Sequence, residues 1–167
     1  MRALVVYGSK MGGTQGLAEM VGRALEERSF DVEVRAAGDV DSVEAYDTIV
    51  VGGALYAARW HRDARRFVRR LRGELRGIPV WFFSSGPLDD SAARKHIPPV
   101  GQVKRLMQRV GARGHVTFGG RLEPNPPGFM ARSMAKKLAG DWRDAAHVER
   151  WVVEVAAALR SEGEARL

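Results

Sequence analysis

The sequence predicts an open α/β fold in which one parallel β-sheet carries helices on both faces. Short apolar runs alternate along the chain with longer segments whose apolar residues recur every three or four positions. Three of these runs end in stretches of small residues, after Tyr7, after Val51 and after Phe83. Alternating strands and helices form βαβ units, and consecutive βαβ units build a parallel sheet.

Five segments are predicted to be strands because they are short and rich in β-branched and aromatic residues. They cover residues 3–7, 31–37, 48–51, 78–83 and 115–118. The second alternates apolar and polar residues, which indicates a half-buried edge strand. With the order 2-1-3-4-5, the first, third and fourth strands meet at the switch point, where open α/β sheets bind their ligands.

Helices are predicted between and after these strands from apolar residues at helical spacing. The first follows the loop that ends at Thr14, and others cover residues 62–76, 100–110 and 125–138. Asn125 and Pro126 suit the start of the segment 125–138, and Asp141 is expected to cap the last helix. No linker or repeat interrupts the pattern, so residues 1–167 are expected to form one domain.

The composition narrows the classes of function. The 167 residues include no cysteine, which excludes disulfides and thiol catalysis, and the four histidines lack the spacing of metal ligands. No apolar stretch approaches the roughly 20 residues that span a bilayer, and the chain enters a strand at once, so a cytoplasmic protein is expected. A net charge of +7 favours anionic partners. The arginine-rich segment 62–76 lacks interleaved aromatic residues, so no nucleic-acid partner is expected.

The first strand, the loop after it and the following helix form a candidate phosphate site. The loop from Gly8 to Thr14 is rich in small residues, and Ser9 and Thr14 add hydroxyl donors. The helix that follows directs unpaired N–H groups and a partial positive charge into this loop. The glycine spacing matches neither a Walker A loop nor the dinucleotide pattern. These residues alone leave open an ordinary strand-to-helix turn.

The chain resembles the flavodoxins over nearly its whole length. Residues 9–14 read Ser-Lys-Met-Gly-Gly-Thr, which is similar to the phosphate-loop signature of that family, and two further small-residue loops follow the third and fourth strands. The resemblance implies a flavodoxin-like doubly wound five-stranded sheet with FMN as cofactor, a deazaflavin being the alternative. It places the phosphate on Ser9, Lys10, Met11, Gly12, Gly13 and Thr14, the isoalloxazine ring along Gly53, Ala54, Leu55, Tyr56 and Ala57, and the pyrimidine edge on Ser84, Ser85, Gly86, Pro87, Leu88 and Asp89.

Within this family the sequence is similar to the menaquinone-dependent protoporphyrinogen oxidases. The shared features are Tyr56 followed by Trp60-His61, the element 119–122 after the fifth strand, a basic helix, and Asp141-Trp142. The chain departs from that branch at residues 86–90, a Gly-Pro-Leu-Asp-Asp run where the branch is basic, and in its basic helix, where the branch is richer in aromatic residues. These departures leave the substrate open.

The resemblance implies an FMN-dependent oxidoreductase that removes hydrogen from a porphyrinogen and passes electrons to a quinone. A porphyrinogen is apolar with two carboxylates, so Tyr56 and Trp60 are expected as walls beside the flavin, and Arg59 and Arg121 as cations at the substrate rim. The flavin carries the redox chemistry, so no side chain is assigned a catalytic role.

A flavodoxin-type electron carrier that docks on redox partners is the alternative function. Carrier flavodoxins are typically acidic, whereas this chain has a net charge of +7, which favours an enzyme. The basic segment 125–138 is either a peripheral contact with an anionic membrane or a helix packed over the sheet edge. The sequence does not fix the oligomeric state.

Overall fold

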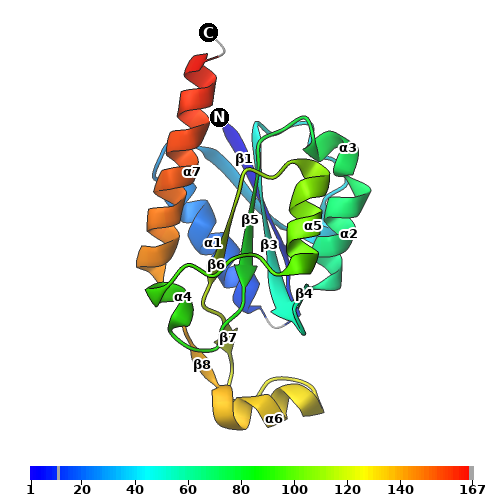
Figure 1. The fold of residues 1–167 in the computed structure, drawn as a ribbon, viewed down its shortest axis with the longest axis vertical. Helices are drawn as coiled ribbons and strands as arrows, with labels where there is room; N and C mark the ends of the chain where they lie inside the picture. Colours follow the sequence, from blue (N-terminus) through cyan, green and yellow to red (C-terminus); the bar gives the residue numbers. More distant parts are fainter. Residues whose placement is uncertain (11, 166–167) are drawn as a thin grey trace.

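Five parallel strands form the centre of the molecule in the order β2-β1-β3-β5-β6, as shown by a computed structural model that describes residues 1–10 and 12–165 (Figure 1). They are β1 (Arg2–Gly8), β2 (Asp31–Ala36), β3 (Thr48–Tyr56), β5 (Val80–Ser85) and β6 (Gly114–Phe118). The predicted fold and strand order are confirmed. A further strand, β4 (Arg59–Trp60), pairs antiparallel with the end of β3 and was not predicted.

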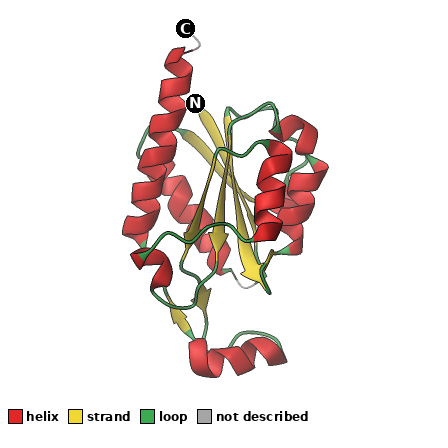
Figure 2. Ribbon diagram, in the orientation of Figure 1, coloured by secondary structure: helices red, strands yellow, loops and turns green. Residues whose placement is uncertain are grey.

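Helices cover both faces of this sheet (Figure 2). One layer contains α1 (Gly13–Glu26) and α7 (Ala145–Ala165), and the other contains α2 (Arg62–Arg70), α3 (Arg72–Leu75) and α5 (Gly101–Val110). Two short helices lie in connections, the 3₁₀ turn η1 (Ala37–Asp39) and α4 (Ser91–Arg94). None of the helices in residues 1–10 and 12–165 has the length and hydropathy that crossing a membrane requires.

The central strands are apolar without interruption because both of their faces are buried. In β1, Ala3 and Val5 pack in the core under α1 and α7, whereas Leu4 and Val6 pack in the core under α2 and α5. Successive side chains of a strand point to opposite faces, so a strand covered on both sides needs apolar residues at every position. The edge strand β2 is partly exposed, as its alternating sequence predicts.

An arm extends beyond the carboxyl ends of the strands (Figure 1). Its base is a two-stranded antiparallel sheet of β7 (Arg121–Leu122) and β8 (Gly140–Asp141), and between these strands lies α6 (Phe129–Leu138). The predicted helix over residues 125–138 therefore begins four residues late. The cause is Gly128, whose φ of 93° is not helical and ends any extension toward Asn125.

The last helix begins at Ala145 rather than directly after Asp141, so the predicted cap is wrong. Asp144 caps it instead, because its carboxylate accepts hydrogen bonds from the backbone N–H groups of Ala146 (2.9 Å) and His147 (3.3 Å). Asp141 belongs to β8 and binds Arg143.

The predicted helix 62–76 is divided into α2 and α3, since Leu71 between them has a φ of −99° and a ψ of 19°, which are not helical values.

Two glycines let β3 continue past its predicted end at Val51. A Cβ atom on Gly52 would lie 2.0 Å from the ring of Phe83, and one on Gly53 would lie 2.5 Å from the indole of Trp60. Both rings are buried, and Phe83 also packs on Phe118 with 5.7 Å between ring centroids. The strand therefore needs glycine at both positions to pass between the two cores.

We predict that Gly52→Ala destabilises the protein, because the added methyl group must displace Phe83 from a filled core. The expected loss in the free energy of unfolding is about 1–3 kcal/mol, measured by urea denaturation. Gly73→Ala in α3 is the matched control, since a Cβ there meets nothing within 4 Å. That control should stabilise by about 0.4–1 kcal/mol. Equal behaviour of the two variants would contradict the packing argument.

Candidate cofactor site

The register of the three central strands brings the predicted loops together. Gly8 of β1 pairs with Gly53 of β3, and Gly53 pairs with Ser84 of β5. The three residues therefore lie in one row across the sheet, and the chain leaves that row as three adjacent loops at the carboxyl edge. Leu55 contacts the third loop, where a Cβ on Gly86 would lie 3.1 Å from its side chain.

The first loop leads into α1 without a capping side chain. Gly12 is the N-cap residue, has a φ of 77°, and makes no side-chain hydrogen bond to the helix. The left-handed conformation at this position suits glycine, and an uncapped helix start presents N–H groups to an anion. Thr14 lies in the first turn and is 1% exposed. Met11, predicted for this loop, lies outside the described residues.

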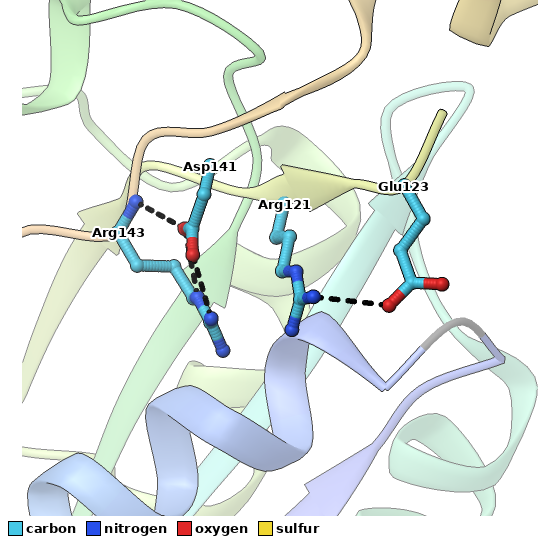
Figure 3. Close-up of polar contacts among 4 residues, drawn as sticks. All are labelled: Arg121, Glu123, Asp141 and Arg143. Atoms are coloured by element: carbon cyan, nitrogen blue, oxygen red, sulfur yellow. Dashed lines mark hydrogen bonds and ion pairs between the residues drawn. The ribbon is translucent and has the colours of Figure 1, made fainter. Parts of the chain in front are cut away.

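Two arginines from the base of the arm lie over the first turns of α1 (Figure 3). The backbone of Arg121 lies against Gly13, since a Cβ there would be 3.3 Å from the arginine carbonyl oxygen, whereas the guanidinium group of Arg143 covers Gly16, where a Cβ would be 3.3 Å from its Cζ. Both border a hollow of about 400 Å³ that includes Gly12 and Arg23. Arg121 was predicted at the substrate rim, and the structure places it beside the phosphate loop.

Carboxylates hold these two arginines in place. Asp141 accepts hydrogen bonds from Nε (2.9 Å) and Nη2 (2.7 Å) of Arg143, and Glu123 accepts one from Arg121 (3.0 Å; Figure 3). The hydrogen bonds from Arg143 are the main cause that lowers the pKa of Asp141 below its usual value. The guanidinium group of Arg143 is therefore held by two hydrogen bonds in a partly buried pair, whereas Arg121 makes a single hydrogen bond in an exposed pair. Each arginine has its charge partly neutralised.

The second loop is a tight hairpin between β3 and β4. Its two turn residues, Ala57 and Ala58, have φ values of 46° and 58°, the conformation of a type I′ turn that usually holds Asn-Gly. Tyr56 precedes the turn and is 41% exposed. Burial raises the pKa of its phenol, and a hydrogen bond with the backbone of Lys10 partly opposes the rise. The Tyr56 ring thus reaches from the second loop to the phosphate loop.

Trp60 does not lie at the rim of the site, and that prediction is wrong. The indole is 1% exposed because β4 turns it under the hairpin onto Gly53, where no side chain competes for the space. Its Nε1–H donates a hydrogen bond to Ser84 Oγ at 2.8 Å. Arg59, the preceding residue, is exposed.

The third loop uses several of its polar groups internally. The backbone N–H of Gly86 donates to the carbonyl of Phe118 (3.1 Å), and the carboxylate of Asp89 accepts from the N–H of Ser91 at the start of α4 (2.8 Å). The hydrogen bonds from Ser91 lower the pKa of Asp89. The hydroxyl of Ser84 is buried behind the loop. The Gly86 N–H, the Asp89 oxygen that accepts from Ser91 and the Ser84 hydroxyl are therefore already hydrogen-bonded within the protein. A ligand would contact other atoms of these residues.

The sequence and the fold were compared with known proteins. The family model described as "Flavodoxin domain" matches residues 4–144. This chain belongs to the flavodoxin domain family. A flavodoxin of Maridesulfovibrio salexigens is 39% identical over 54 residues, which are 30% of this chain and 37% of that protein. A flavodoxin of Nitratidesulfovibrio vulgaris is 42% identical over 52 residues, or 29% and 35% of the two chains.

These aligned segments span little more than a third of each relative's length. Among solved structures, the flavodoxin of Streptococcus pneumoniae TIGR4 superposes with a TM-score of 0.62 at 19% identity, covering 95% of this chain and 99% of that one. At this level of identity the likeness shows the fold, and the family assignment rests on the sequence match.

FMN is the cofactor of this flavodoxin domain. The phosphate loop fits it on independent grounds, because Gly12 is left-handed and the start of α1 has no capping side chain. An anionic phosphate is the group that satisfies such a helix end. When bound, FMN supplies the redox chemistry of the site.

Sequence reasoning missed the polar groups that support the site from other elements. Arg143 covers α1, and His115 of β6 lies behind the third loop, with its Nε2 2.8 Å from Ser84 Oγ. Neither belongs to a local motif. The one available signal for Arg143 was the carboxylate at Asp141, two residues earlier in the chain.

Thr14→Ala is expected to weaken FMN binding, because Thr14 lies in the first turn of α1 and its hydroxyl is predicted to donate to the phosphate. A hydrogen bond to a charged group contributes about 1.5–3 kcal/mol, which is roughly a 10- to 150-fold increase in Kd. Fluorescence titration of the apoprotein with FMN measures this change. Thr14→Ser should retain the affinity, and riboflavin, which has no phosphate, should bind all three proteins equally. A similar loss for riboflavin would show that the hydroxyl does not serve the phosphate.

Proposed function

We propose that residues 1–167 act as one FMN-binding unit that transfers electrons between redox partners. The observation that carries this proposal is the alignment of three loops at Gly8, Gly53 and Ser84, beside an uncapped helix start. The electron carrier was the alternative function in the sequence analysis. The flavodoxins that match in sequence support it better than they support a protoporphyrinogen oxidase. A cytoplasmic location is part of the proposal.

Fewer of the expected residues support a protoporphyrinogen oxidase function. Of its expected rim residues, Trp60 is buried and Arg121 lies at the phosphate end of the site, so Arg59 and Tyr56 stay as the candidates near the ring. A porphyrinogen is wide and carries two carboxylates, and one arginine meets only part of that need. The electron-carrier function needs no substrate pocket beyond the flavin edge.

We expect the FMN-loaded protein to exchange electrons rapidly with a flavodoxin reductase and to pass them to cytochrome c, measured by stopped-flow absorbance. We expect no oxidation of protoporphyrinogen above the FMN-free control when a menaquinone analogue is present, followed by porphyrin fluorescence. Arg59→Ala serves as a check on the second assay. Porphyrin formation that depends on FMN and falls in Arg59→Ala would overturn the carrier assignment in favour of the oxidase.

The helix α6 supports a proposal about where this transfer occurs. Met130, Met134 and Leu138 follow one another at four-residue intervals, and they are 80%, 49% and 42% exposed. The same helix carries Arg132 and two lysines with no acidic residue. Packing over the sheet edge does not account for such exposure. An interfacial helix with a basic polar face suits an anionic lipid surface, so we propose that α6 rests on one and places the flavin edge near the bilayer.

Vesicle co-sedimentation tests this contact. Binding should increase as phosphatidylserine replaces phosphatidylcholine, and the pair Lys136→Gln and Lys137→Gln should weaken it by roughly 30-fold, since each basic residue near the surface contributes about 1 kcal/mol. Arg66→Gln with Arg69→Gln is the control pair, because it removes the same charge from exposed positions on α2. Binding that ignores the anionic lipid content, or equal losses in both pairs, would sink the idea.

A further inference from the structure

The charges of this chain are divided between the two helix layers. On one side of the sheet, α2, α3 and α5 carry nine basic residues, all arginine or lysine, and two acidic residues. On the other side, α1 and α7 carry three basic and six acidic residues (Figure 1). The first layer therefore has a net charge of +7 and the second a net charge of −3, so the molecule has a basic and an acidic side.

Exposed cations of the basic layer form a row along α2. Arg62, Arg66 and Arg69 follow one another at intervals of four and three residues, which places them on one side of the helix. All three are exposed, and the row is about 10 Å long at a rise of about 1.5 Å per residue. Among residues 1–10 and 12–165, Arg66 and Arg69 form no ion pair. This arginine row therefore presents positive charge that the protein itself does not neutralise.

A hollow of about 720 Å³ lies beside the arginine row, between α2 and η1. Three arginines of α2 border it, and so do two carboxylates, Asp41 and Asp63. Each carboxylate already has an arginine partner, Arg70 at 3.9 Å for Asp41 and Arg62 at 3.8 Å for Asp63. The unpaired arginines of the row therefore stay available to acidic groups of a partner that enter this hollow.

The arginine row begins beside the second FMN loop. The helix α2 starts two residues after Trp60, which packs on Gly53, and the exposed Arg59 precedes Trp60 in β4. The helix α5 starts at the same place, because its Gln102 accepts a hydrogen bond from the backbone N–H of Trp60 (3.1 Å). A protein bound along α2 would therefore have one end close to the cofactor site, as electron transfer between proteins requires.

The side chains of the basic layer indicate which anionic partner suits it. In the part of the chain that the structure describes, none of the large apolar residues exposed to solvent belongs to α2, α3 or α5. The helix α6 offers apolar and basic side chains together, as helices on lipid surfaces do, whereas this layer offers charge alone. It also lacks the exposed aromatic residues on which single-stranded nucleic acids stack. A folded protein with clustered carboxylates needs only the matching charge.

We propose that the arginine row of α2 is the docking site for an acidic redox protein that exchanges electrons with the bound FMN. This inference rests on the proposed electron-transfer function and adds the chemistry of the partner and the surface that receives it. Complementary charge speeds the encounter of two proteins more than it raises their final affinity. The row thus steers the carboxylates of the partner toward the second FMN loop.

A small acidic iron–sulfur protein, plant-type [2Fe–2S] ferredoxin, is a suitable probe. Its binding to the FMN-loaded protein is measured by calorimetry with both proteins oxidised, so that no electron moves. Electron transfer is measured separately by stopped-flow absorbance, in which reduced ferredoxin loses one electron and the oxidised FMN protein gains it. Cytochrome c, a basic protein, is the comparison, and it takes one electron from the reduced FMN protein.

We expect the rate constant with ferredoxin to fall about tenfold when the ionic strength rises from about 0.01 M to about 0.15 M, because the Debye length shortens from about 30 Å to about 8 Å. The rate constant with cytochrome c should rise over the same range, since both proteins are basic.

The variant Arg66→Gln with Arg69→Gln should lower the affinity for ferredoxin and, at low salt, the rate constant of electron transfer, each by about tenfold. Arg150→Gln with Arg160→Gln is the matched control, because it removes the same charge from exposed positions on α7, in the acidic layer. Both double variants should keep their FMN affinity.

The docking site is overturned if ferredoxin does not bind, if the rate constant does not fall with salt, or if the two double variants lose equally. It is also overturned if Arg66→Gln with Arg69→Gln loses binding to vesicles or duplex DNA but not to ferredoxin, which would assign the row to lipid or nucleic acid. Rapid transfer to cytochrome c beside any of these results leaves the electron-carrier function intact. Ferredoxin binding that needs the row, without electron transfer to either protein, would instead overturn that function and with it the redox role of the row.

Discussion

The packing of Trp60 on Gly53 is the constraint on which the cofactor edge depends. Because Gly53 has no side chain, the indole of Trp60 packs directly over it, at a place where a Cβ atom on Gly53 would be only 2.5 Å away. Trp60, the residue that ends the hairpin after β3, is buried as a result. The hairpin then has two turn residues with positive φ, and the Tyr56 phenol forms a hydrogen bond with the backbone of Lys10 in the first loop. The same indole N–H holds Ser84, so one buried ring orients parts of two FMN loops.

Much of the fold could be predicted from the sequence because its signals are local. The strands of the central sheet are continuous apolar runs, and the alternation of strands and helices determines a parallel sheet. The strand, glycine-rich turn and helix start at residues 2–26 were also predictable, since their signals lie within a few residues of one another, and the assignment of the phosphate to this turn stays a prediction. The strand order alone predicts that the three loops are neighbours, whereas the register that places Gly8, Gly53 and Ser84 in one row comes from the structure.

The features that could not be predicted depend on distant partners. A tryptophan next to a predicted flavin loop has the same local sequence whether it is exposed or buried, and only the empty space over Gly53 decides its place. Arg143 covers a helix that begins 130 residues earlier in the chain. The start of α6 was misjudged because Asn125 and Pro126 are good first residues in isolation, whereas the φ of 93° at Gly128 excludes them from the helix.

The arrangement of charges changes what the net charge of +7 means for the flavin. Arg121 and Arg143 lie over the first turns of α1, but each is paired with a carboxylate at 3.0 Å or less. A paired cation contributes far less potential than an isolated one, which at 4 Å would supply about 4 kcal/mol at an effective dielectric constant near 20. Basic residues also gather on α2 and on α6, and α6 has no acidic residue. The net charge therefore says less about the reduced flavin than about the surfaces that meet partners, and this removes the main sequence argument against an electron carrier.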